Sequence, residues 1–206
     1  MSLQNRVTPW GEFVATSARG TLMGNRGILH DETGTLGAAR WKHNKWVTCR
    51  LEFRGRRREP MPAGGYTALF FLDEATALAA GHRPCGECRR ENLAAFRAAL
   101  GADRLDLATL DRHLHGERTD RATRQVRPHV ADIATLPDGT MILTPDGSRG
   151  GPTCAALVWG DALHPWTVQG YRPPLPRPVR GTARVLTPPT IRRALAGGYR
   201  AAWLGG

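Results

Sequence analysis

Cysteine and long apolar segments are both scarce in this chain of 206 residues. Only four cysteines occur, and a chain of this length buries roughly 70% of the surface that its unfolded form exposes, so it needs no disulfide staples to fold. No apolar run reaches the ~18 residues that a membrane-spanning helix needs. Segment 1–10 lacks the basic start and the apolar core of a signal peptide. We therefore expect a cytoplasmic protein without a membrane partner, in which paired cysteines serve as metal ligands or redox groups.

Acidic residues are also few in comparison with basic ones. The chain has 18 Asp and Glu against 29 Lys and Arg, which gives a formal net charge of +11, and most of the basic residues are arginine. Such an excess is typical of proteins that bind polyanions, with nucleic acid first and anionic membrane surfaces second. A genome of high GC content, which enriches Arg, Ala, Gly and Pro together, is the alternative source of this charge.

The pattern along the chain predicts an α+β fold with its helices in the middle. In the first third, “EFVAT”, “RWKHNKWVTCRLEF” and “YTALFF” are typical of short strands. A short helix is expected over 73–80, capped by Asp73 and ended by Gly81. Two further helices should follow, one that ends near Leu100 and one over about 108–121.

Strand signals dominate beyond Val130. Two Pro-Asp-Gly turns enclose “TMILT”, and “CAALVWGDALHPW” predicts a hairpin. A last short helix is expected after Thr187 and Pro188. These patterns divide the chain into region 1–101, with a zinc-knuckle core, short strands and central helices, and region 102–206, a helix followed by a β-rich part. The alternative is one continuous domain.

The stretch “AGHRPCGECRRENLAAF” carries a Cys-x-x-Cys pair, Cys85 and Cys88, between a prolyl turn and a predicted helix start. This geometry points two thiolates at one centre, as in a zinc knuckle. Two further ligands must then come from elsewhere, and Cys49, His30 and His43 all lie upstream. A thioredoxin-like dithiol, or a pair that binds no metal, are the alternatives.

The segment “FFLDEATALAAGHRPCGECRRE” resembles the zinc-binding domain of the Ada family of DNA alkylation-repair regulators. That domain shows a phenylalanine strand, an acidic-alanine helix and then Ala-Gly-aromatic-Arg-Pro-Cys-x-x-Cys. “GNRGILH”, followed by Cys49, is similar in order to related metal-binding modules of some nucleases. The resemblance extends over about Leu22 to Arg90. It implies a Zn²⁺ ion held by the four residues His30, Cys49, Cys85 and Cys88.

The chain departs from the Ada pattern in the spacing of the first two ligands. They lie four residues apart in the Ada domain, whereas a longer insertion separates His30 from Cys49 here. Ada accepts a methyl group on its first cysteine ligand. A histidine cannot do so, and a methyl-acceptor role would fall on Cys49.

A zinc deaminase is the alternative from a different class of function. Its signature is His-x-Glu followed by Pro-Cys-x-x-Cys, and the chain contains “HDE” at 30–32 and “PCGEC” at 84–88. In such a site His30, Cys85 and Cys88 hold zinc, and Glu32 transfers protons for the attacking hydroxide. The Gly- and Thr-rich sequence after His30 is a poor helix, and this arrangement leaves Cys49 without a role.

The stretch “CRLEFRGRRRE” places a run of arginines beside two tryptophans. Arginines on a hairpin can lie along a phosphate backbone, and an indole can stack on a base. A solvated turn beside buried tryptophans is the alternative. The sequence thus predicts a zinc-containing protein that binds nucleic acid, DNA rather than RNA, in DNA repair or processing. Its predicted nucleic-acid contacts are Arg54, Arg56, Arg57, Arg58, Trp46 and Arg90.

Overall fold

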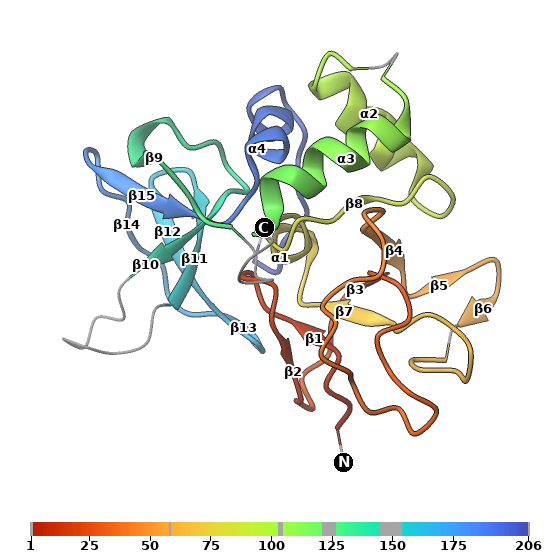
Figure 1. The fold of residues 1–206 in the computed structure, drawn as a ribbon. Helices are drawn as coiled ribbons and strands as arrows, with labels where there is room; N and C mark the ends of the chain where they lie inside the picture. The colour runs from red at the N-terminus through yellow and green to blue at the C-terminus, as the bar shows by residue number, and fades with distance from the viewer. Residues whose placement is uncertain (1, 58, 103–104, 121–126, 145–153, 206) are drawn as a thin grey trace.

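A computed structural model of the chain describes residues 2–57, 59–102, 105–120, 127–144 and 154–205. These residues form two large β-sheets and four α-helices, which confirms the predicted α+β class. Figure 1 shows the N-terminal strands, in red to yellow, and the C-terminal strands, in teal to blue, on either side of helix α1 (Glu74–Ala79). No helix in these residues is long and apolar enough to cross a bilayer.

The first sheet carries the segments that meet at the candidate site. Its strand order is β2-β1-β7-β3-β4-β8. β3 pairs antiparallel with β4, with Met23 opposite Cys49, and β4 pairs parallel with β8, with Val47 opposite Arg83. The strands are β1 (Arg6–Val7), β2 (Phe13–Val14), β3 (Leu22–Asn25), β4 (Val47–Arg50), β7 (Leu69–Phe71) and β8 (Arg83–Pro84).

A two-stranded hairpin follows β4 and projects away from both large sheets (Figure 1). It consists of β5 (Glu52–Phe53) and β6 (Arg56–Arg57). Its two central residues both have positive φ, 54° at Arg54 and 71° at Gly55, as a two-residue type I′ turn requires. The Arg54 guanidinium lies 5.1 Å from the ring centroid of Phe53.

The second sheet is antiparallel and forms the C-terminal part of the chain. Its order is β13-β12-β11-β10-β15-β9, and β14 also pairs with β12. A short 3₁₀ helix, Ile133–Thr135, follows β9. The strands are β9 (His129–Asp132), β10 (Met141–Thr144), β11 (Cys154–Trp159), β12 (Ala162–Thr167), β13 (Gly170–Tyr171), β14 (Leu175–Pro176) and β15 (Thr182–Val185).

Helix α1 lies where three hydrophobic clusters meet, and all six of its residues are buried. Ala77 and Ala80 belong to the cluster of the first sheet, and Ala75 and Ala79 to the cluster of the second. Leu78 joins the third cluster, which the other helices form. The helix is therefore enclosed on every side, and its small alanines allow the neighbouring layers to approach closely.

The third cluster joins parts of the chain on both sides of residue 101. Phe96 of α2 (Arg90–Ala99) and Leu110 and Leu114 of α3 (Leu107–Arg118) pack with Ile191 and Leu195 of α4 (Pro189–Ala196). The C-terminal helix therefore packs on the helices that follow the Cys-x-x-Cys pair, so hydrophobic contacts cross the boundary drawn from sequence.

The local signals around α1 are confirmed. The Asp73 carboxylate accepts a hydrogen bond from the Thr76 amide at 2.8 Å and caps the helix. Gly81 has a φ of 83°. A Cβ atom at Gly81 would lie 2.4 Å from Cδ of Arg118. Glycine is therefore required there both by its backbone conformation and by the close approach of Arg118.

Two buried carboxylates at the start of α1 hold the end of the chain. Glu74 accepts hydrogen bonds from the Tyr199 hydroxyl at 2.5 Å and the Ala202 amide at 3.2 Å. It also pairs with Arg89 at 2.8 Å. Asp73 accepts from the Leu204 amide at 3.1 Å. Because these groups are buried, each carboxylate depends on its partners to offset the loss of water.

We predict that Glu74→Ala lowers the free energy of unfolding by about 3–5 kcal/mol, because it leaves the Arg89 guanidinium buried without its carboxylate. Tyr199→Phe, which removes one hydrogen bond only, should cost about 1 kcal/mol. Urea unfolding followed by circular dichroism measures both, with Glu91→Ala on the exposed side of α2 as the control. Equal stability of Glu74→Ala and Glu91→Ala would contradict this account.

Candidate functional site

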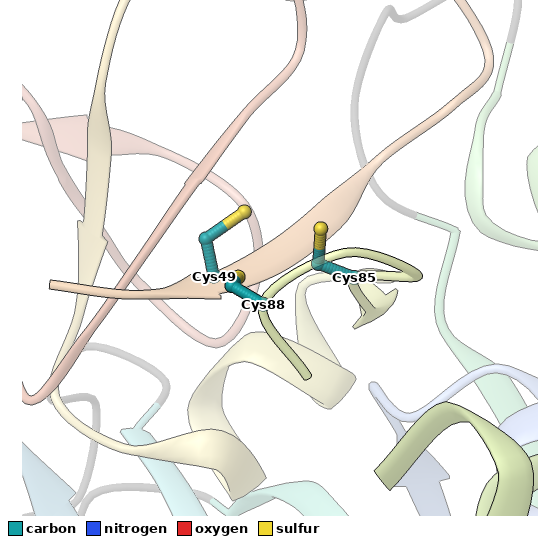
Figure 2. A group of neighbouring side chains, drawn as sticks. All are labelled: Cys49, Cys85 and Cys88. Carbon is teal, nitrogen blue, oxygen red and sulfur yellow. The ribbon is translucent and has the colours of Figure 1, made fainter. Parts of the chain in front are cut away.

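Three cysteines from two neighbouring segments converge at the edge of the first sheet. The Sγ atoms of Cys49, Cys85 and Cys88 lie within 4.8 Å of one another. Figure 2 shows Cys49 on its strand and the other two on the loop that passes beside it. The Cys85 amide donates a hydrogen bond to the Thr48 carbonyl at 2.9 Å, continuing the β4–β8 pairing into the loop. The sheet register therefore brings distant parts of the sequence together.

Interactions within the group shift the pKa values of the three thiols in different directions. The contact with Cys49 lowers the pKa of Cys85 to about 5, and the same contact, with burial, raises the pKa of Cys49. Burial raises the pKa of Cys88. The Glu87 amide also donates to the Cys85 sulfur at 3.4 Å, which favours the thiolate. Cys85 is therefore the most acidic of the three thiols, and a bound divalent cation would favour the thiolate form of all three.

The donor set fits a soft or borderline metal ion such as Zn²⁺. Tetrahedral zinc with Zn–S bonds of about 2.3 Å has sulfurs about 3.8 Å apart, and the observed limit of 4.8 Å requires only a small inward adjustment. Among the described residues, no fourth His, Cys, Asp or Glu donor joins the group at this distance. Three of the four ligands predicted from sequence are thus brought together.

His30 is not brought to the three thiols, and its predicted role as a ligand requires correction. Its Nδ1 lies 2.6 Å from the Thr67 hydroxyl and its Nε2 lies 3.3 Å from the Pro62 carbonyl oxygen. Both ring nitrogens are therefore engaged in holding the 30–36 loop to the segment before β7. Glu32 is exposed in that loop. The ligand set of a zinc deaminase is consequently not assembled in this structure.

A cavity of about 1150 Å³ opens beside the thiols. Met23, Asn25, Val47 and Cys49 line part of it. Because Met23 pairs with Cys49 and Asn25 with Val47, these four side chains project from one face of the sheet. His43, unlike His30, also borders this cavity. The wall further includes basic and aromatic side chains, Lys45, Arg50, Phe53, Arg56, Arg57 and Tyr66.

The predicted basic contacts are found mainly on the hairpin. Arg54, Arg56 and Arg57 are exposed, and Arg90 is exposed at the start of α2. Arg58 lies outside the described residues. Arg89, next to Arg90, is instead buried and pairs with Glu74. The hairpin therefore presents a cluster of cations at the rim of the thiol cavity.

Trp46 is fully buried, so its predicted stacking on a nucleic-acid base is wrong for this structure. The guanidinium carbons of Arg26 and Arg118 each lie 4.0 Å from its ring centroid. Its indole N–H donates to the His43 carbonyl at 2.9 Å. The ring of His82, itself fully buried, lies 5.3 Å away. Trp46 is thus a core residue that packs against buried cations.

The buried guanidinium groups around this site were not anticipated from sequence. Arg83, at 1% exposure, forms a bidentate pair with Asp111 at 2.7 and 2.8 Å. Burial lowers the pKa of Arg26 to about 9, with a further contribution from Arg40. Arg118 donates to the carbonyl oxygens of Gly81 and Asn44. The sequence held one local signal for these pairs: Asp111 lies on the same face of the α3 helical pattern as its leucines, which indicates a buried carboxylate that needs a cation.

Comparison of the chain with protein-family models, with curated proteins and with solved structures finds no match.

We predict that Trp46→Ala costs about 3–5 kcal/mol of stability, because it opens a cavity in the core and removes the ring that packs against two buried guanidinium groups. Trp41→Ala, at a half-buried ring nearby, should cost less. Urea unfolding of both variants provides the measurement. Wild-type stability in Trp46→Ala, combined with weakened nucleic-acid binding, would restore the base-stacking role.

Proposed function

We propose that this protein binds nucleic acid, DNA in preference to RNA, and holds one Zn²⁺ ion on Cys49, Cys85 and Cys88. The preference for DNA and a role in DNA repair or processing follow from the resemblance of residues 22–90 to the Ada zinc-binding domain. The observation that carries the proposal is the convergence of three thiols beside a projecting hairpin of exposed arginines.

The metal would act mainly as a structural link. A zinc ion on the three thiolates would connect β4 to the loop before α2, and the hairpin continues directly from β4. His43 borders the same cavity as the three thiols, whereas His30 does not. His43 is therefore the better placed of the two histidines considered as a fourth ligand. None of the four cysteines forms a disulfide, which is consistent with a reducing compartment and supports a cytoplasmic location.

The exposed arginines of the β5–β6 hairpin would supply the positive charge that attracts nucleic acid. Arg54, Arg56 and Arg57 are exposed on a short ribbon with a fixed turn. A two-stranded ribbon has the dimensions to enter the major groove of a duplex. Arginines along it would contact phosphates, and each such contact releases condensed counterions.

The metal assignment predicts about one zinc ion per purified chain. Cys49→Ser, Cys85→Ser and Cys88→Ser should each lose most of this zinc, since each removes one thiolate. Cys154→Ser is the matched control and should keep it, as should His30→Ala. Elemental analysis gives the zinc content. A metal-free wild type, or a loss in His30→Ala equal to that in Cys85→Ser, would refute the ligand set.

The nucleic-acid assignment predicts that affinity for a short DNA duplex falls steeply as salt rises. Replacing Arg54, Arg56 and Arg57 with serine should weaken binding across sequences and flatten the slope of log K against log salt by about one unit per lost contact. Fluorescence anisotropy at several salt concentrations measures both quantities.

The matched control removes the same three charges from the C-terminal region. Arg172, Arg180 and Arg184 are all exposed there, and their triple-serine variant should bind almost as the wild type does. Equal losses in the two triple variants would show that only total charge matters. No binding by the wild type at low salt would reject nucleic acid as the partner.

A further inference from the structure

The cavity beside the thiols is larger and more varied than a metal site requires. Its volume is about 1150 Å³, whereas pockets for small ligands usually measure about 300–1,000 Å³. A metal ion on the three cysteines would use one part of the lining. The remaining lining is available to a second ligand with the size of a nucleotide.

The lining offers the groups that recognise a planar heterocycle. Phe53 and Tyr66 contribute aromatic rings, and Asn25 contributes an amide. Within the described part of the chain, the Asn25 amide makes no hydrogen bond to another residue. An amide presents a donor beside an acceptor, which matches the edge of a nucleobase, and aromatic faces stack on any base.

The cations are placed where the flanking phosphates would lie. Arg56 and Arg57 are exposed on the hairpin and also border the cavity, as do Lys45 and Arg50. A strand whose backbone follows the hairpin arginines therefore passes the mouth of the cavity. Since Trp46 is buried, the rings available for stacking near these cations are those of the cavity itself.

The geometry points to a cavity that receives the base of one nucleotide turned out of the bound strand, with its flanking phosphates held by the hairpin. This inference rests on the proposed binding of nucleic acid and names the unit that enters the site. Turning a base out of a duplex costs least where the base is mismatched or damaged. The protein should therefore favour duplexes that contain such a position.

The test compares two labelled DNA duplexes of equal length, one fully paired and one with a single central mismatch, by fluorescence anisotropy. The wild type should bind the mismatched duplex about tenfold or more tightly. Asn25→Ala should lose most of this preference and keep the affinity for the paired duplex. Phe53→Ala should also lose the preference, with some loss of paired-duplex affinity because Arg54 packs on its ring. Gln169→Ala, at an exposed amide in the turn between β12 and β13, is the control and should keep the preference.

The possible outcomes distinguish nucleic-acid binding by the hairpin from entry of a base into the cavity. Equal wild-type affinity for both duplexes, or a preference that survives both cavity variants, would overturn the inference and leave nucleic-acid binding intact. Absence of binding to either duplex at low salt would remove the proposed function and the inference with it. A further arm titrates the four free deoxynucleoside monophosphates. Binding that depends on Asn25, together with equal affinity for the two duplexes, would assign the cavity to a free nucleotide and overturn the strand version.

Discussion

Three hydrophobic clusters converge on α1, and this convergence requires that the helix have small residues on its faces and no exposed polar side. The N-cap residue Asp73 and the first helical residue Glu74 are therefore also buried. Asp73 accepts locally from the amide and hydroxyl of Thr76, and the other partners of the two carboxylates come from distant parts of the chain. Tyr171, Tyr199 and the amides near the C-terminus supply those groups. The helix thus ties the first sheet, the second sheet and the end of the chain through both packing and hydrogen bonds.

Buried arginine changes what the basic composition means. Arg26, Arg83 and Arg118 are almost completely enclosed. Arg83 alone among the three donates hydrogen bonds to a carboxylate, that of Asp111. The other two rely on carbonyl oxygens, on His82 and on the face of Trp46. Total charge is therefore a poor measure of the surface that a partner meets. Arg54, Arg56 and Arg57 of the hairpin have no such enclosure, so their charges are available to the proposed nucleic acid.

The predictable features of the fold were those with a local cause. The Asp73 cap, the left-handed Gly81 and the Cys-x-x-Cys loop each depend on a few adjacent residues, and all three were located from sequence. His30 and Trp46 were misassigned because their environments depend on residues far along the chain, Thr67 for the first and Arg118 for the second. A histidine near a cysteine, or an indole near arginines, has the same local pattern whether it is buried or exposed. Cys49 was one of several upstream candidates, and the pairing of β4 with β8 is the nonlocal contact that brings its sulfur to those of Cys85 and Cys88.

The thiol loop is connected to the same buried network that holds the C-terminus. Thr48 accepts from the Cys85 amide through its carbonyl and from Arg89 through its hydroxyl, and Arg89 then pairs with Glu74. Hydrogen bonds that involve none of the sulfurs therefore help to hold the thiol loop against β4. The proposed Zn²⁺ ion would add stability by mass action, and it need not create the fold as it does in small zinc fingers. Loss of one thiolate should for that reason lower metal content without unfolding the protein, because the hydrogen bonds that Arg89 donates to Thr48 and Glu74 involve none of the sulfurs.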